Sequence, residues 1–308
     1  MKWSKTNGLI AATLTPFHQD GSINLDIIGR YVDHLLSIGI TQVFVNGTAG
    51  EHASLTVEER EAIAERWIKE GKGKLTRIII QVGTLNLPDS QRLAAHAEAI
   101  GADGISVITP CYYATSDISS LVDYCAAVAH SAPKTPFMYY HFPAITHATF
   151  RLTDWLLAAE KKIPTLIGAK CTCLDLYDAC DAANLFGGRF DVPVGADFQQ
   201  LGAMAMGLPG AIGISFSLLG KAQNRMVQAY NSGDIATAQR EQFKVQEFWN
   251  ASGSNAGLHP MIASFKAIMK LNGLDIGSPR LPIKPLDDAK VAELSAKLKA
   301  MDFSKWIQ

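Results

Sequence analysis

The chain lacks an excess of charge of either sign, and only a small share of its residues is charged. Its 28 Lys and Arg residues nearly balance 29 Asp and Glu residues, so the net charge is -1 and no basic surface favours nucleic acid. Only 19% of the residues are charged and 48% are hydrophobic, which argues against disorder. We also expect no membrane-spanning segment. These features predict a globular protein whose partner is a small molecule, with neither nucleic acid nor membrane as a partner.

Cysteine is also scarce. The chain has five cysteines in 308 residues, an odd number, and no pair has the C-x-x-C spacing. A chain of this length folds without disulfides, so free and mostly buried thiols are the simplest interpretation. Cys171 follows Lys170 and could react with electrophiles, but the local sequence offers no base for nucleophilic catalysis.

A secretory signal is not visible. Residues 1–5 lead directly into a strand-like segment, without an apolar core or a small-residue cleavage site. The sequence therefore predicts a cytosolic protein.

Short apolar or β-branched runs alternate with helix-like segments along most of the chain. The helix signals include a capping box at residues 56–59 and Gly101 at a helix end. Eight such units predict a parallel (β/α)8 TIM barrel. A doubly wound sheet is the alternative, but no G-x-G-x-x-G follows the first run. The eight runs are residues 9–14, 41–45, 77–82, 104–108, 136–140, 165–170, 190–194 and 210–214.

The pattern changes to helices alone after about Lys221. We therefore predict a catalytic barrel over residues 1–220 and a helical C-terminal region over residues 221–308. No linker or low-complexity tract separates the two parts. The helices expected in this region are 222–231, 235–251, 260–272 and 287–301.

Chemically informative residues stand where the predicted strands end, which is where such barrels place catalytic groups. Tyr140 ends the fifth run and Lys170 ends the sixth. A lysine amine in a dehydrated pocket favours its neutral form, which can attack a ketone to give a Schiff base, and a nearby phenol could move protons. The simpler interpretations are a surface lysine and a core aromatic.

Residues 47–51, GTAGE, follow the second run and could hold a carboxylate. Their backbone N–H groups and the Thr48 hydroxyl are suitable donors. A plain tight turn is the alternative interpretation of this glycine-rich loop.

Three motifs together resemble a known family. GTAGE at 47–51, YHFPA at 140–144 and IGAK at 167–170 are similar to the pyruvate-dependent class I lyases, the family of dihydrodipicolinate synthase and N-acetylneuraminate lyase. The resemblance covers nearly the whole chain. Residues 44–48, 96–105 and 279–282 are most similar to the animal N-acetylneuraminate lyase branch of this family.

This resemblance implies a reaction. Lys170 would form a Schiff base with the C2 ketone of a 2-keto-3-deoxy sugar acid, and cleavage of the C3–C4 bond would give pyruvate and an aldehyde. Tyr140 would act as general acid and base. The implied substrate is N-acetylneuraminate, cleaved to N-acetylmannosamine and pyruvate, without a cofactor or a metal.

The resemblance also implies a homotetramer and a set of substrate-binding positions. Tyr112 matches a position that reaches a neighbouring subunit's site, although Tyr113 competes for that assignment. Asp197 could also cap the helix that begins beside it. The implied positions are Thr48, Ala49, Tyr112, Thr172, Gly195, Asp197, Phe198 and Ile214.

Four positions depart from the family pattern. Ile145 replaces the arginine of the dihydrodipicolinate synthase branch, which argues against that branch. Ala49, Phe198 and Ile214 replace polar residues of the sialic acid branch, and apolar side chains cannot compensate a buried sugar hydroxyl. Two alternatives therefore stay open: an aldolase or dehydratase for another 2-keto-3-deoxy acid, and a catalytically silent keto-acid-binding barrel.

Three histidines, His52, His141 and His147, lie in segments that flank the expected site. They could supply polar contacts or a proton relay, or they could be solvated or buried in the core. Their spacing matches no metal-ligand pattern, so we expect no metal site.

Overall fold

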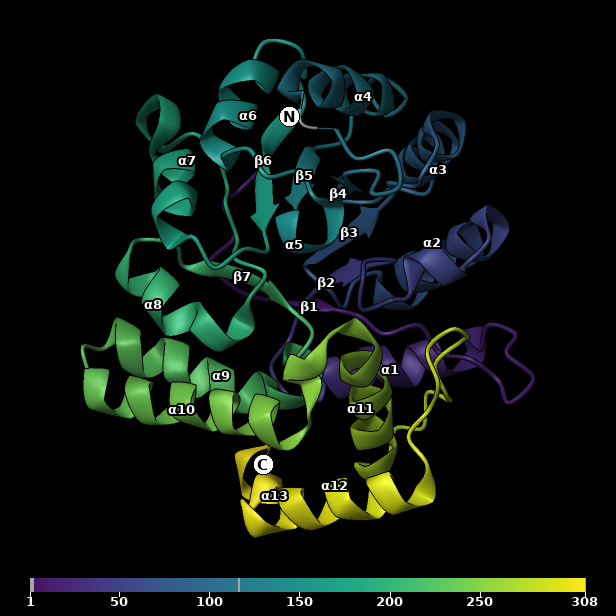
Figure 1. Ribbon diagram of the computed structural model, residues 1–308, viewed down its shortest axis with the longest axis vertical. Helices are drawn as coiled ribbons and strands as arrows, with labels where there is room; N and C mark the ends of the chain where they lie inside the picture. The colour runs from purple at the N-terminus through teal and green to yellow at the C-terminus, as the bar shows by residue number, and fades with distance from the viewer. Residues whose placement is uncertain (1–2, 116, 308) are drawn as a thin grey trace.

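The computed structural model describes residues 3–115 and 117–307 as a barrel of parallel strands surrounded by helices (Figure 1). Of the N-terminal segment considered above, Met1 and Lys2 lie outside the described residues. The strands pair in the order β6-β5-β4-β3-β2-β1-β7. Their bounds are β1 (Gly8–Ala12), β2 (Gln42–Val45), β3 (Arg77–Gln81), β4 (Gly104–Ile108), β5 (Phe137–His141), β6 (Leu166–Cys171) and β7 (Gly210–Gly213).

Residues 190–194 occupy the place of the remaining predicted strand, between β6 and β7. The Ala169 N–H donates to the Asp191 carbonyl at 2.9 Å, and the Val194 N–H donates to the Gly210 carbonyl at 3.0 Å. The segment pairs through isolated bridges, not as a continuous strand, and Pro193 is one reason, since it has no N–H to donate. The (β/α)8 prediction is thus confirmed, with one irregular strand.

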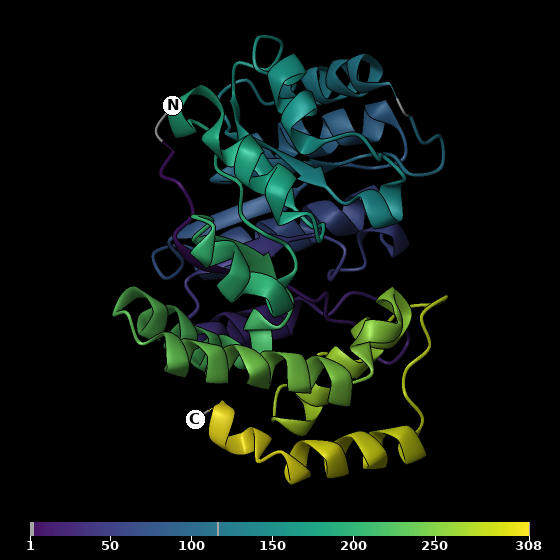
Figure 2. The ribbon, with the colours of Figure 1, turned by 60° about the vertical axis from the view of Figure 1, so that its left-hand side comes forward.

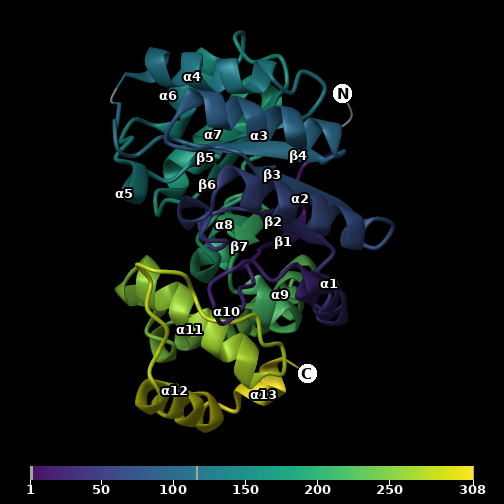
Figure 3. The ribbon, with the colours of Figure 1, turned by 90° about the vertical axis from the view of Figure 1, so that its right-hand side faces the viewer.

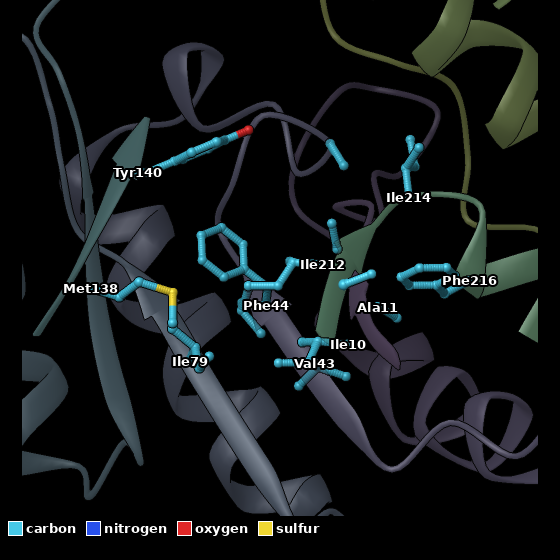
Figure 4. Packing of buried hydrophobic residues seen from close by; sticks show 14 of the residues in the cluster. Ile10, Ala11, Val43, Phe44, Ile79, Met138, Tyr140, Ile212, Ile214 and Phe216 are labelled. Carbon is cyan, nitrogen blue, oxygen red and sulfur yellow. The ribbon is translucent and has the colours of Figure 1, made fainter. Parts of the chain in front are cut away.

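The strands are apolar because both of their faces are covered. All five residues of β4 and of β5 are buried, as expected for parallel strands between a filled barrel interior and an outer layer of helices. Figure 4 shows Ile10, Val43, Ile79 and Met138 packed together from four different strands. The side chains fill the barrel, so the site can form only at its end.

The outer helices begin and end at the signals that the sequence carries. Glu59 N–H donates to Thr56 Oγ1 at 3.2 Å, and Thr56 N–H donates to Glu59 Oε2 at 3.0 Å, so the predicted capping box is confirmed. Gly101 has a φ of 81° just after α3, the left-handed conformation that ends many helices. These helices are α1 (Ile28–Ser37), α2 (Val57–Gly71), α3 (Leu87–Ala99), α4 (Ile118–His130), α5 (Pro143–Thr146), α6 (Leu152–Ala159), α7 (Leu176–Gly188), α8 (Gln200–Ala205) and α9 (Phe216–Asn231).

Four further helices extend the barrel at one end, α10 (Ile235–Ala251), α11 (Leu258–Leu271), α12 (Asp288–Ala300) and α13 (Phe303–Trp306). Figures 2 and 3 show α12 and α13 as an outer layer, with α10 and α11 between them and the barrel. The predicted boundary at residue 220 falls within α9, and the division of the chain there stays a prediction. Over the residues described, no helix is both long and apolar enough to cross a membrane.

A buried ion pair joins α11 to the loop after β2. Lys266 Nζ lies 2.7 Å from Glu51 Oε1, and the two side chains are 1% and 0% exposed. Glu51 Oε2 also accepts a hydrogen bond from the Arg280 N–H at 2.8 Å, and Lys266 Nζ donates to the Ser278 carbonyl at 3.1 Å. Burial lowers the pKa of Lys266 to about 8, although Glu51 acts in the opposite direction. Each buried charge therefore depends on its partner.

We expect Lys266→Met to lower the free energy of unfolding by about 3–5 kcal/mol, because it leaves the Glu51 carboxylate buried without its cation. The Glu51→Gln/Lys266→Met double variant is the matched control. It removes both charges and should recover most of the loss. Urea denaturation followed by circular dichroism measures both, and a double variant as unstable as the single one would contradict the assigned role of the pair.

Candidate active site

A cavity of about 510 Å³ opens where the strands end and where α10 and α11 approach the barrel. Most of the predicted site residues line it, namely Thr48, Ala49, Tyr140, Lys170, Thr172, Gly195, Asp197, Phe198 and Ile214. The structure thus brings residues from positions 48 to 214 together around one cavity. Figure 4 shows Tyr140 and Ile214 on opposite sides of this opening, with Phe44 between them.

Lys170 lies deep in the cavity and is 4% exposed. The pairing of β5 with β6 places it directly opposite Tyr140. Its Nζ atom lies 4.1 Å from the centroid of the Tyr140 ring and 4.5 Å from that of the Phe44 ring. Within residues 3–115 and 117–307, no carboxylate forms a salt bridge with it. The amine is therefore shielded by aromatic faces and available to a ligand in the cavity.

Tyr140 connects the lysine to the glycine-rich loop. Its hydroxyl lies 3.3 Å from Thr48 Oγ1, the one hydrogen bond between this phenol and a side chain of the described ranges. Its ring packs edge-on against Phe44, with centroids 5.8 Å apart. A buried phenol beside a hydroxyl group and an amine can pass a proton between them and a bound molecule.

The loop at 47–51 is shaped by close packing. A Cβ atom at Gly47 would lie 2.8 Å from the Phe44 ring, so a larger residue would disturb the ring beneath Lys170. Thr15 Oγ1 donates to the Gly50 carbonyl at 2.6 Å. Glu51 ends the loop with a φ of 55°, held there by the ion pair with Lys266. The loop is therefore a fixed structure whose N–H groups can receive an anion.

Two buried oxygen atoms of cavity residues have no partner among the described residues: Thr172 Oγ1 and Asp197 Oδ1. The other oxygen of Asp197, Oδ2, accepts hydrogen bonds from Ser215 N–H at 2.9 Å and Ser215 Oγ at 2.6 Å. Burial raises the pKa of Asp197 despite these hydrogen bonds. Unpaired buried oxygens are costly, and the hydroxyl groups of a bound ligand would satisfy them.

Gly195 leaves the space that the Thr172 side chain occupies. A Cβ atom on Gly195 would lie 1.8 Å from Thr172 Oγ1, far inside contact distance. The Gly195 N–H also donates to the Cys171 carbonyl at 2.7 Å. Asp197 does not act as a helix cap, the alternative role expected for it. Neither the helical turn η3 (Asp197–Gln199) nor α8 has a side-chain cap.

The wall that faces the C-terminal helices is apolar. Phe198 packs edge-on against Trp249 of α10, with ring centroids 5.3 Å apart, and Ile214 lines the same cavity. The sequence did not predict the cavity residues of the helical extension. Residues at strand ends can be recognised as site candidates, whereas an apolar helix position has the same pattern whether it faces the core or a cavity. The missed residues include Trp249, Leu258 and Met261, together with Cys173 and Leu174.

Tyr112 lies elsewhere. It is 79% exposed, packs edge-on against Tyr113 at 5.2 Å, and does not line the cavity of its own chain. The expected contact of Tyr112 with substrate is therefore not formed within one chain.

The three flanking histidines do not line the 510 Å³ cavity either. His141 is buried beside Phe150, and burial lowers its pKa to about 4. Burial and then the nearby Arg60 charge lower the pKa of His52 to about 3, and this residue borders a second cavity. His147 is exposed. No cluster of three or more potential metal ligands occurs in the described part of the chain.

Comparison with known proteins agrees with this arrangement. Residues 5–301 match the dihydrodipicolinate synthetase family. The chain is 41% identical to the N-acetylneuraminate lyase of Mus musculus over 302 residues, covering 97% of this chain and 93% of the relative, and 42% identical to that of Homo sapiens over 303 residues with the same coverage. The solved N-acetylneuraminate lyase of Proteus mirabilis superposes with a TM-score of 0.92 at 35% identity, covering 97% of this chain and all of the other. The sequence motifs, the barrel and the cavity at its strand ends thus lead to one conclusion, that this chain belongs to the dihydrodipicolinate synthetase family.

Proposed function

We propose that the protein is a class I aldolase that cleaves N-acetylneuraminate to N-acetylmannosamine and pyruvate. The observation that carries the proposal is the buried Lys170 amine in the cavity, 4.1 Å from the Tyr140 ring and free of salt bridges within the described ranges. Full-length relatives named N-acetylneuraminate lyase support the choice of substrate.

The residues suit each step of this reaction. Lys170 attacks the C2 ketone, and loss of water gives a protonated imine. The proton of the C4 hydroxyl then passes to the substrate carboxylate, with Tyr140 hydrogen-bonded as the relay, as the C3–C4 bond breaks. The bonding electrons form the C2–C3 double bond, and the protonated imine becomes a neutral enamine. Protonation of C3 and hydrolysis release pyruvate and regenerate the amine.

The loop at 47–51 would hold the substrate carboxylate. Its N–H groups and Thr48 Oγ1 are donors, and the 3.3 Å contact of Thr48 with Tyr140 would place the carboxylate beside the phenol. Thr172 Oγ1 and Asp197 Oδ1 would receive sugar hydroxyls, since both are buried and lack partners within the described residues.

Replacing the lysine tests the chemistry. We expect Lys170→Ala to abolish pyruvate release from N-acetylneuraminate and to remove the adduct trapped by borohydride with pyruvate, because Lys170 is the only lysine among the described residues that line the cavity. The matched control is Lys161→Ala, an exposed lysine outside the cavity, which should retain both. Full turnover in Lys170→Ala would refute the Schiff-base mechanism.

A second candidate substrate is a 2-keto-3-deoxy acid with a shorter or less polar tail. It is favoured by the apolar wall of Phe198, Ile214 and Trp249, which offers few partners to a hydroxylated tail. A silent binding barrel is not favoured, because the amine and the phenol are arranged for reaction.

Substitution of Phe198 distinguishes the two substrates. If N-acetylneuraminate is the substrate, we expect Phe198→Glu to raise kcat/KM for it by about tenfold, since a carboxylate can accept from the tail hydroxyls. Phe198→Leu is the control that keeps the wall apolar. The preference is measured as kcat/KM for N-acetylneuraminate and for a six-carbon 2-keto-3-deoxy acid. If the wild type prefers the shorter acid and Phe198→Glu reverses this preference, the second candidate is the substrate.

We propose further that the protein is a cytosolic homotetramer in which Tyr112 enters a neighbouring subunit's cavity. Support comes from the exposed Tyr112 and Tyr113, at 79% and 84%, because large exposed aromatics often mark interfaces.

We expect Tyr112→Ala to lower kcat/KM by about tenfold and to weaken assembly, because it removes an aromatic anchor. Tyr113→Ala, the adjacent and equally exposed tyrosine, is the control and should change activity less. Sedimentation velocity and pyruvate release measure the two effects. A wild-type monomer with full activity would show that the site is complete in one chain.

A further inference from the structure

Two thiols lie together at the edge of the cavity, and the proposed reaction uses neither. Cys171 ends β6 directly after Lys170, while Cys173 lines the cavity two residues later. Their Sγ atoms are 3.1 Å apart. Two sulfurs this close need only a small adjustment of their side chains to reach the separation of about 2.05 Å found in a disulfide.

The two thiols are not equivalent. Cys171 is buried at 1% exposure, and its hydrogen bond to Cys173, together with burial, raises its pKa. Cys173 is half-buried, and the same hydrogen bond lowers its pKa. An accessible thiol that ionises more readily is the attacking group in thiol–disulfide exchange, and a protected neighbour is the resolving group.

We propose that Cys173 and Cys171 form a modification site for small disulfides of the oxidised-glutathione class, and that the resulting internal disulfide switches off the Lys170 site. The Cys173 thiolate attacks one sulfur of the small disulfide, which releases the first thiolate and leaves a mixed disulfide. Cys171 then attacks the Cys173 sulfur, and the second thiol leaves with the Cys171 proton. Two protein thiols are oxidised, and one small disulfide is reduced to two thiols.

The bond would act on the site through Thr172, which lies between the two cysteines. Thr172 N–H donates to the His141 carbonyl at 2.8 Å, and its Oγ1 faces the space that Gly195 leaves open. Drawing the two sulfurs from 3.1 Å to bonding distance constrains the backbone on both sides of Thr172, immediately after Lys170. This consequence for activity rests on the proposed function, whereas formation of the disulfide does not.

The test treats the full chain with oxidised glutathione and then makes two measurements. Peptide mapping by mass spectrometry locates the disulfide, and borohydride trapping with pyruvate measures the competence of Lys170. We expect a Cys171–Cys173 disulfide and a fall in trapped adduct of about tenfold or more, since small displacements at a reacting centre can cost about a hundredfold. Dithiothreitol should restore the adduct.

Matched variants separate this pair from the other thiols. Cys171→Ser and Cys173→Ser should lose the response to oxidised glutathione, each compared with its own reduced form. Cys180→Ser, a half-buried thiol outside the cavity, should keep it. If the mapped peptide contains mixed disulfides or free thiols but no Cys171–Cys173 disulfide, the proposed modification site is wrong. If the disulfide form traps as much pyruvate as the reduced form, the proposed effect on Lys170 is wrong. A reduced protein that traps no pyruvate would instead refute the proposed function, and the disulfide map alone would then decide on the thiol site.

Discussion

Two opposite charges lie out of water where α11 meets the loop after β2, and the surrounding contacts are organised around them. Lys266 and Glu51 are 2.7 Å apart, and the Phe17 ring lies 4.2 Å from the lysine Nζ. Arg280 donates its backbone N–H to Glu51, while its guanidinium group binds both carboxylate oxygens of Glu59 at 2.7 Å. This arrangement fixes Glu51 and with it the loop that carries Thr48. The position of Thr48 beside Tyr140 therefore depends on a helix more than 200 residues away in the sequence.

The sequence predicted the parts of the molecule that follow from local patterns. Eight apolar runs and their helix signals gave the barrel, and the rule that catalytic groups stand at strand ends placed Tyr140 and Lys170 in one site. Even the capping box at Thr56 formed as expected. These features depend on residues close together in the chain or on the topology of the barrel.

Other parts could not be predicted from one sequence. Trp249 and Met261 line the cavity, but an apolar residue on a helix has the same pattern whether it faces a core or a ligand. The Glu51–Lys266 pair links two segments that no short-range signal connects. The role proposed for Tyr112 depends on a second chain, since the residue is exposed and does not line the cavity of its own chain.

The cavity is lined by two parts of the chain, and this separates the groups proposed to react from much of the apolar wall. Lys170, Tyr140 and Thr48 come from the strands and the loop of the barrel, whereas Trp249, Leu258 and Met261 come from the helical extension. Changes in α10 and α11 can therefore alter the apolar wall while the groups proposed to react stay fixed by the barrel. Such a division gives this scaffold a route to new substrates during evolution or directed engineering, because one half can diverge under a constant reaction.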